Sequence, residues 1–336
     1  FRSYHPQRLT LQGGQTVAPR QPQPVDNKAQ LPAMLSPTAI NRYMRCPLQF
    51  HYYYVCGLHE PDQTDDDTID NRIFGNIFHE ASRILYTQLT AQSPLITADI
   101  IDQLLKHPAH IHLAVDQAFR QELFRLKPGQ RPNFTPRLNG LQIINREVII
   151  HYLRRLLLLD RSLAPFTILD LEGLVTTNIT VTIGQQPVQV NVGGRIDRLD
   201  MITDKEGREQ IRVIDYKTGA HRLHPLAGVD DVFRQECLSN HSDYYLQTML
   251  YALIVAHQNP GKAVAPALLF IQHAGTEHYN PILCFGKTPI TDVTAHAHTF
   301  TALLNSTVEK MFSPDMPLTP TPYTERCLTC PYRQLC

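Results

Sequence analysis

Hydrophobic residues recur at helical spacing through the first half of the chain. Between residues 71 and 90 they return every three or four positions, which is typical of an amphipathic helix. The Ser-Pro pair at 36–37 can cap and begin an earlier helix, which Pro47 should break or kink. Further helical stretches are expected at about 97–125 and 138–163, so the first half is predicted to be rich in helices.

The pattern changes after Pro165. Residues 167–217 are rich in Val, Ile and Thr, alternate strictly over 180–183 and contain glycine turn signals, so they predict four or five strands. Four further elements are expected: a helix at about 241–258, a strand at 265–272, a short strand near 281–285 and a helix at about 291–312. The chain is therefore predicted to have an α/β fold.

The organisation along the chain follows from these elements. Residues 1–33 carry many glutamines and prolines without a sustained period, which predicts a linker or a segment that wraps a neighbour. Residues 34–336 are expected to form one domain, with a helical part at 34–164, a sheet core at 165–285, and a final helix and cysteine-rich end at 286–336.

Composition restricts the possible partners. The 31 basic and 31 acidic side chains cancel, so a polyanion would have to bind in a local basic groove. The acidic run at 60–70 has no apolar spacing and is expected to be a solvated loop. No apolar run approaches the roughly 18 residues of a membrane span, and no export signal is evident, so no membrane association and a cytoplasmic location are expected. Because the chain starts at Phe1, we expect it to be part of a longer polypeptide.

Two aspartates and a lysine lie where neighbouring strands could bring them together. Asp197 ends the run V-G-G-R-I, and Asp215 follows an apolar run, with Lys217 two positions later. Residues i and i+2 of a strand share a face, so Asp215 and Lys217 should project together while Tyr216 points away. A carboxylate pair with a lysine predicts a Mg²⁺ or Mn²⁺ site that would polarise a phosphate. The alternative is ordinary solvated or ion-paired strand ends.

Other polar residues stand in positions that could complete such a site. Gly75 and His79 share a helix face, where the glycine would clear space above the imidazole. Glu172 lies in an apolar strand, where a buried carboxylate needs a partner, and Gln247 and Tyr251 share a face of a later helix. Each also has a simpler interpretation, as a histidine at the core edge, a glutamate at a strand end or an amphipathic helix face.

The order of these motifs resembles the nuclease module of the RecB-like branch of the PD-(D/E)XK superfamily. The shared motifs are G-x-x-x-H in a helix, a strand with Glu, G-G-x-I-D, D-x-K and Q-x-x-x-Y, and the likeness covers about 34–336. The resemblance implies a restriction-endonuclease-like mixed central sheet flanked by helices, with a helical N-terminal half. It implies metal binding by His79, Asp197, Asp215 and the backbone carbonyl of Tyr216, catalysis by Asp215, Lys217, Asp197 and Glu172, and DNA contacts by Gln247 and Tyr251.

The seven cysteines, an odd number without a signal peptide, favour reduced thiols or metal ligands over a disulfide framework. Cys327, Cys330 and Cys336 form a C-x2-C-x5-C pattern, and with the distant Cys46 they make a four-sulfur site that would join the two ends of the domain. This spacing leaves both Zn²⁺ and a [4Fe-4S] cluster possible. The remaining three, Cys56, Cys237 and Cys284, are expected to be buried free thiols.

The cysteine arrangement is similar to the iron-sulfur clasp of AddB-type bacterial helicase-nuclease subunits. This resemblance favours a [4Fe-4S] cluster, which could be lost or replaced by zinc. It also implies an upstream helicase domain in the same polypeptide and a second helicase-nuclease subunit.

The function implied by the resemblance is that of a metal-dependent DNA exonuclease in double-strand break repair and recombination, acting on linear or single-stranded ends. Arg42 and Arg45, with Arg326 and Arg333 of the tail, could form a local path for the DNA backbone, or could be scattered surface charge. Two alternatives remain: a catalytically silent nuclease-like DNA-binding or scaffolding module, and a zinc-stabilised interaction domain.

Overall fold

The computed structural model describes residues 34–59, 69–127, 130, 137–203, 206–219, 223–274, 279–313 and 315–336. The predicted linker at 1–33 and most of the acidic run at 60–70 lie outside these residues. Within the described part of the chain, no helix is long and apolar enough to cross a bilayer.

Helices make up most of the described residues in the first half of the chain, as predicted. The α-helices are α1 (Pro37–Arg45), α2 (Pro47–Phe50), α3 (Asn71–Leu89), α4 (Ala98–Lys106), α5 (Ala109–Glu122), α6 (Gly140–Leu163), α7 (Val229–Val232), α8 (Ser242–Gln258) and α9 (Ala297–Phe312). Short 3-10 or π segments are η1 (His51–Val55), η2 (Gln235–Asn240), η3 (Val293–His296) and η4 (Thr324–Cys327). The strands are β1 (Leu95–Ile96), β2 (Phe166–Leu171), β3 (Leu174–Ile183), β4 (Gln186–Arg195), β5 (Arg198–Thr203), β6 (Glu209–Lys217), β7 (Ala263–Phe270), β8 (Cys284–Phe285) and β9 (Thr288–Pro289).

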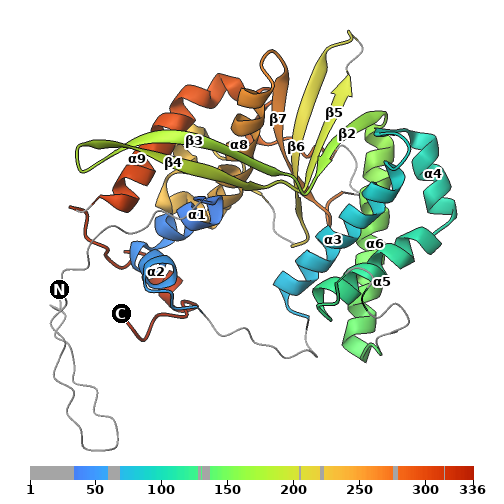
Figure 1. The fold of residues 1–336 in the computed structure, drawn as a ribbon, viewed down its shortest axis with the longest axis horizontal. Coiled ribbons are helices and arrows are strands. Elements are labelled where there is room, and N and C mark those ends of the chain that lie inside the picture. The colour runs from blue at the N-terminus through green and yellow to red at the C-terminus, as the bar shows by residue number, and fades with distance from the viewer. Residues whose placement is uncertain are drawn as a thin grey trace, which may run out of the picture.

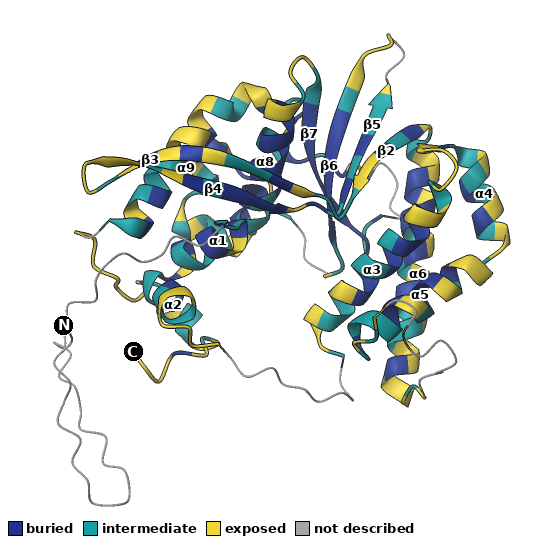
Figure 2. Cartoon of the chain, viewed as in Figure 1, coloured by how far each residue is buried: buried dark blue, intermediate teal, exposed yellow. Residues whose placement is uncertain are grey.

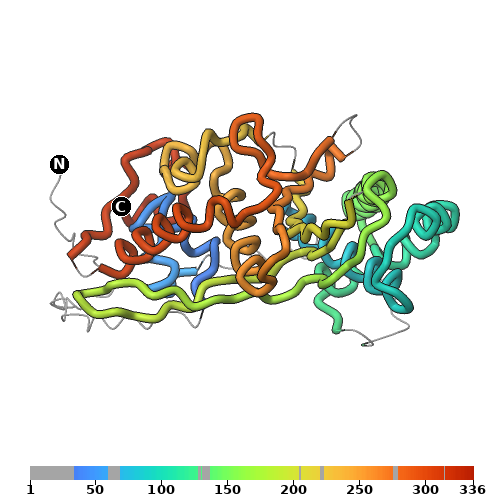
Figure 3. Tube along the Cα trace, turned by 90° about the horizontal axis from the view of Figure 1, so that it is seen from above, coloured from blue at the N-terminus to red at the C-terminus, as the bar shows by residue number. Residues whose placement is uncertain are grey.

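The central sheet has the order β1-β2-β5-β6-β7 (Figure 1). Only β6 and β7 run parallel in it, and the other neighbours are antiparallel, which confirms the predicted mixed sheet. Strands β3 and β4 pair with each other as a separate hairpin. Figure 3 shows this hairpin running along one side of the molecule.

Helices cover the central sheet on both faces, so the chain is a layered α/β domain (Figure 1). One apolar core joins α3 to α6 with one face of the sheet, and a second joins α1, α8, α9 and the hairpin with the other. Strand β6 is buried along most of its length (Figure 2). Its side chains alternate, because Val213 belongs to the second core whereas Ile214 and Tyr216 belong to the first.

Helix ends follow the local sequence. The side chain of Ser36 accepts a hydrogen bond from the amide of Ala39, and α1 ends before Pro47, as predicted. Asp70, at the end of the acidic run, accepts one from the amide of Ile73 and so caps α3. The helical stretch predicted at about 97–125 consists of two helices, α4 and α5. The chain breaks between α4 and α5 at Pro108, which has no amide hydrogen to continue a helix.

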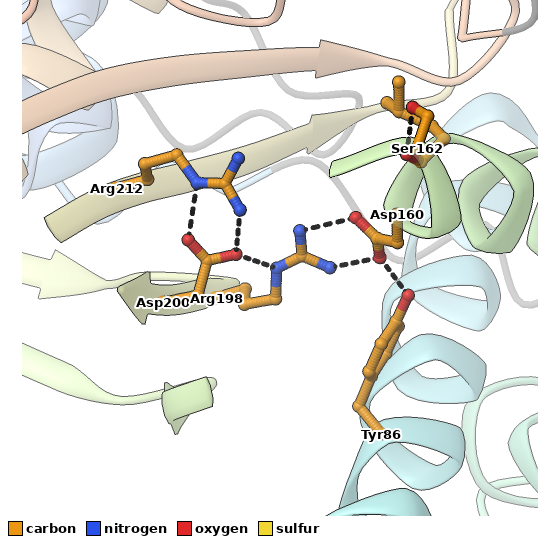
Figure 4. A network of polar contacts seen from close by, with 7 residues as sticks. Tyr86, Asp160, Ser162, Arg198, Asp200 and Arg212 are labelled. Atoms are coloured by element: carbon orange, nitrogen blue, oxygen red, sulfur yellow. Dashed lines mark hydrogen bonds and ion pairs between the residues drawn. The ribbon is translucent and has the colours of Figure 1, made fainter. Parts of the chain in front are cut away.

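A chain of buried ion pairs ties the centre of the sheet to the helical layer (Figure 4). The guanidinium of Arg198 in β5 holds the carboxylate of Asp160 in α6 through both oxygens, at 2.6 and 2.9 Å. Its Nε lies 3.2 Å from Asp200, which in turn binds Arg212 in β6. The hydroxyl of Tyr86 in α3 also donates to Asp160. This ion-pair network fixes β5 against α3 and α6.

Candidate metal centre and active site

Glu172 and Asp197 lie where the chain crosses between the central sheet and the β3–β4 hairpin. The amide of Glu172 donates to the carbonyl of Asp197 at 3.0 Å, and the amide of Ile196 donates to the carbonyl of Gly173 at 2.9 Å. The two crossings are therefore held side by side. Glu172 has a φ of 55°, in the left-handed region, where a residue other than glycine is strained by about 1–3 kcal/mol. The surrounding backbone pairing holds this strained carboxylate beside Asp197.

His79, from α3, completes a compact group of three metal-binding side chains. Its Nδ1 lies 3.1 Å from Oδ1 of Asp197 and 4.0 Å from Oε1 of Glu172. One donor atom from each of the three side chains lies within 4.8 Å of the other two. The other oxygen of Asp197 accepts a hydrogen bond from the amide of Tyr216 at 2.6 Å, which links the group to β6. One imidazole nitrogen and two carboxylates suit a divalent cation of the Mg²⁺ or Mn²⁺ type.

Asp215 and Lys217 project together from the end of β6, as the strand alternation predicts. Nζ of Lys217 lies 2.6 Å from Oδ2 of Asp215. Gln247, on α8, donates to Oδ1 of Asp215 at 2.9 Å and accepts from Lys217 at 3.5 Å. The side chain of Tyr216 points the other way and packs against Phe78 of α3, with ring centroids 5.8 Å apart. The carboxylate–lysine pair is thus oriented by a glutamine from the neighbouring layer.

The three-residue group contains Glu172, which the sequence motifs placed among the catalytic residues and not among the metal ligands. Asp215 stands beside this group and is paired with Lys217. Metal binding by Asp215 and by the backbone carbonyl of Tyr216 therefore stays a prediction.

The electrostatics of the site are dominated by burial and by crowded carboxylates. Burial alone would lower the pKa of His79, but the negative charges of Asp197, Asp215 and Glu172 outweigh it and raise that pKa to about 9. Burial, reinforced by Asp197, raises the pKa of Glu172 to about 7. Burial also raises the pKa of Asp215, although Lys217 opposes the shift. A bound cation would relieve this accumulation of negative charge.

The double glycine before Asp197 has a packing reason. A Cβ on Gly194 would lie 2.3 Å from the hydroxyl oxygen of Tyr251, and one on Gly193 would lie 2.1 Å from the carbonyl oxygen of Val175. Gly193 also has a φ of 156°, which side-chain-bearing residues rarely adopt. Tyr251, predicted to contact DNA, is only 5% exposed and lies beneath β4.

Gly75 has room for a small side chain. The atom nearest to a Cβ built on it is Oγ1 of Thr218, at 3.8 Å, which is an ordinary contact distance. Gly75 lines the same cleft as His79, and its role in leaving space above the imidazole stays a prediction.

The four cysteines predicted to form one site line a single small cavity. Cys46, between α1 and α2, meets Cys327, Cys330 and Cys336 of the C-terminal tail there. Burial and then the neighbouring thiols raise the pKa of Cys336, because several thiolates would repel one another. Tyr332 donates to the carbonyl of Leu58, and Tyr52 donates to that of Leu335 at 3.2 Å, so the tail is tied to the segment after α2.

Among the other cysteines and the basic residues, Cys56 and Arg42 do not lie where the sequence predicted. Cys56 is exposed, so the expectation of a buried thiol was wrong there, and Cys237 and Cys284 are half-buried. Arg45 lines the cysteine cavity with Arg326 and Arg333. Arg42 does not, because its guanidinium stacks on the ring of Tyr53, at 3.6 Å from the centroid.

Sequence reasoning missed two residues beside the site. The ring of Tyr244, one turn before Gln247, lies 4.5 Å from Nζ of Lys217. The exposed Arg195, between the double glycine and Asp197, lines the cleft with His79 and Glu172. The position of Tyr244 one helical turn from Gln247 was the signal that could have found it. Arg195 carried no comparable signal, because an exposed arginine at a strand end is ordinary.

Comparison with known proteins gave one family. The model of the PD-(D/E)XK nuclease superfamily matches residues 34–336. Among solved structures, the chain is similar to one described as "Crystal structure of SSO0001", with 13% identity, a TM-score of 0.26, and coverage of 86% of this chain and 93% of that chain. Because this TM-score is low, the structural likeness carries no argument, and the family assignment rests on the match to the family model. Curated proteins gave no match.

Proposed function

The chain belongs to the PD-(D/E)XK nuclease superfamily, and from this membership we propose that it is a metal-dependent DNA exonuclease. The family implies hydrolysis of phosphodiester bonds with the help of a divalent metal ion. The observation that carries the proposal is the meeting of His79, Glu172 and Asp197 beside the Asp215–Lys217 pair. The three carboxylates of this site outnumber its two cationic side chains, His79 and Lys217, which favours a site for a cation.

The donor set fits Mg²⁺ or Mn²⁺. His79, Asp197 and Glu172 would hold the ion, with Asp215 and the carbonyl of Tyr216 as further candidate ligands. Hard oxygen donors with one imidazole suit such ions, and the crowded carboxylates lack a full set of compensating cations in the described site. When bound, the ion would supply charge for the phosphate oxygens and lower the pKa of a water molecule.

The chain's own residues would orient the reacting groups. Lys217, held by Asp215 at 2.6 Å, is placed to orient the attacking water and to offset charge on the phosphate. Gln247 binds both partners and so restricts their rotation. The ring of Tyr244 faces the ammonium of Lys217, which favours its charged form and limits its position.

We further propose that this domain is of the AddB type and works in double-strand break repair as part of a bacterial helicase-nuclease. Support comes from the four cysteines that line one cavity together with three arginines. Thiolates repel one another without a metal centre, and the arginines would offset the charge of an anionic cluster. The proposed partners are linear or single-stranded DNA ends, an upstream helicase domain and a second subunit.

The nuclease proposal is tested by degradation of end-labelled linear DNA in Mn²⁺. Wild-type protein should degrade the DNA, and chelation should stop it. Asp215→Ala should be inactive, while Asp116→Ala, which removes an aspartate that is 48% exposed on α5, should retain activity. Equal activity in wild type and Asp215→Ala, or none in either, would refute the enzymatic proposal and leave a silent DNA-binding or scaffolding module.

The cluster proposal is tested separately by anaerobic purification. We expect brown protein with about four iron atoms and matching sulfide per chain. Cys330→Ser should lose the iron, whereas Cys237→Ser should keep it, because Cys237 lies outside the cavity. Stoichiometric zinc without visible absorbance in the anaerobic protein would instead establish the zinc-stabilised alternative.

A further inference from the structure

A polar cleft of about 420 Å³ opens beside the proposed metal centre. Residues of α3 form one wall, including Asn76, His79 and Arg83. Glu172 and Arg195, from the crossings between the hairpin and the sheet, form the other wall. The metal-binding side chains are recessed in this region, with Asp197 11% and Glu172 19% exposed. His79 and Glu172 line the cleft themselves, so a substrate strand lying in it would come next to the metal-binding side chains.

Two arginines that line the cleft, Arg83 and Arg195, differ in whether their charge is already paired. Arg83 holds Glu80 through two contacts of 2.8 and 2.6 Å, so its charge is already compensated. The side chain of Arg195 is exposed and makes no hydrogen bond or ion pair with any residue that the structure describes. Arg195 is therefore a cation that is free to bind an anion at the rim of the metal centre.

The strand geometry fixes the direction of Arg195. Gly194 faces Tyr251, so the next side chain along β4 projects to the opposite face. Leu174 lies directly opposite Arg195 in the β3–β4 register, which places the two side chains next to each other. Leu174 is 65% exposed, an unusual position for a leucine. An exposed apolar side chain thus lies next to the arginine that lines the cleft.

We propose that Arg195 binds a phosphate of the substrate strand adjacent to the phosphate being cleaved, and that Leu174 packs against the nucleoside between them. This inference rests on the proposed nuclease function and names a strand-binding subsite within it. The chemistry fits, because a guanidinium binds phosphate oxygens in a bidentate manner and an aliphatic side chain covers a sugar or base face. The chain has no net charge to attract the strand, and the crowded carboxylates of the site would otherwise repel it.

The proposed subsite should affect DNA binding and Mn²⁺ binding in opposite directions. Arg195 attracts DNA but repels a divalent cation in the neighbouring centre. Replacing it should therefore weaken DNA binding without weakening Mn²⁺ binding. A purely structural role would weaken both, because a distorted crossing would displace Glu172 and Asp197 as well.

Anisotropy of a short fluorescein-labelled single strand in Ca²⁺ tests this, since binding is then measured without cleavage. We expect Arg195→Gln to raise the Kd about tenfold and to reduce the salt slope by about 0.7. Leu174→Ser should raise the Kd about threefold. Matched controls are Arg208→Gln, with a side chain 76% exposed, and Leu113→Ser, 64% exposed, neither of which should change the Kd.

Calorimetry with Mn²⁺ completes the test. Arg195→Gln should bind Mn²⁺ at least as tightly as wild type, which also shows that the site is folded. A Kd for DNA within twofold of that of Arg208→Gln, or a joint loss of DNA and Mn²⁺ binding, would overturn the subsite. If wild type binds the strand through Arg195 but never degrades DNA in Mn²⁺, the nuclease proposal fails while the phosphate subsite stands.

Discussion

Two groups of buried charges meet at the start of β5, and their positive and negative charges are balanced differently. Asp197 belongs to the candidate metal centre, and the next residue, Arg198, belongs to the ion-pair network of Figure 4. In the network two arginines face two aspartates, and the side chains of Arg198, Asp160 and Asp200 are fully buried. In the metal centre three carboxylates face one histidine and one lysine.

The difference shows what buried charge is used for in each region. Bidentate pairs in the network satisfy each carboxylate, so the network holds β5 in place without another ion. In the metal centre burial and repulsion raise the pKa of Asp215 and Glu172, so the carboxylates are held together at a cost. The balanced network thus positions the unbalanced group, in which we propose that a cation binds.

An aspartate-to-asparagine substitution should mainly affect cleavage in the metal centre and mainly affect stability in the ion-pair network. Asp215→Asn should lower the cleavage rate by about 10³-fold or more, because the charge beside Lys217 is lost. The free energy of unfolding of the metal-free protein should fall less than in Asp160→Asn, because burial already disfavours ionised Asp215, although Lys217 loses its partner. Asp160→Asn should instead unfold the protein more easily, because it leaves Arg198 partly unpaired. Nuclease assays and urea denaturation measure the two effects.

A second substitution tests the network alone. Arg198→Met should lower the free energy of unfolding by about 3–5 kcal/mol, because Asp160 and Asp200 lose their shared partner. Adding Asp160→Leu should restore much of that loss, since the uncompensated carboxylate is removed. Urea denaturation of the single and double variants is the measurement. A double variant no more stable than Arg198→Met would show that the network does not act through charge balance.

The residues of the metal centre could be predicted from the sequence, whereas the ion-pair network could not. Asp215 and Lys217 were found because strand alternation places residues i and i+2 on one face, and His79 because the motif order matched a family. The partners of Arg198 could not be found, since Asp160 lies on a helix that only tertiary packing brings to β5. The same holds for Arg195, whose meaning depends on the cleft that it lines.

A change of pH should alter the stability of the metal-free protein less than these substitutions do. The pKa of His79 is raised from its ordinary 6.5 to about 9, so its contribution to stability is present below about pH 6.5 and is lost as the pH rises through 9. Glu172, raised from 4.5 to about 7, has the same sign at lower pH. Metal-free wild type should therefore lose stability from pH 5 to 9, as measured by thermal unfolding.

His79→Gln provides the control for this prediction. The variant cannot take up the proton, so its stability should change less between pH 6.5 and 9 than that of wild type. A wild-type curve as flat as that of the variant would contradict the assigned role of the carboxylates around His79.

The most direct test of the metal centre is calorimetric titration of Mn²⁺ into metal-free wild type and Asp197→Asn. The substituted amide can still accept the hydrogen bond from Tyr216, which is 2.6 Å long in the structure, so the fold should survive. We predict saturable binding to wild type and at least tenfold weaker binding to the variant. Equal Mn²⁺ affinity in the two proteins would contradict the claim that this group of carboxylates and histidine is a metal site.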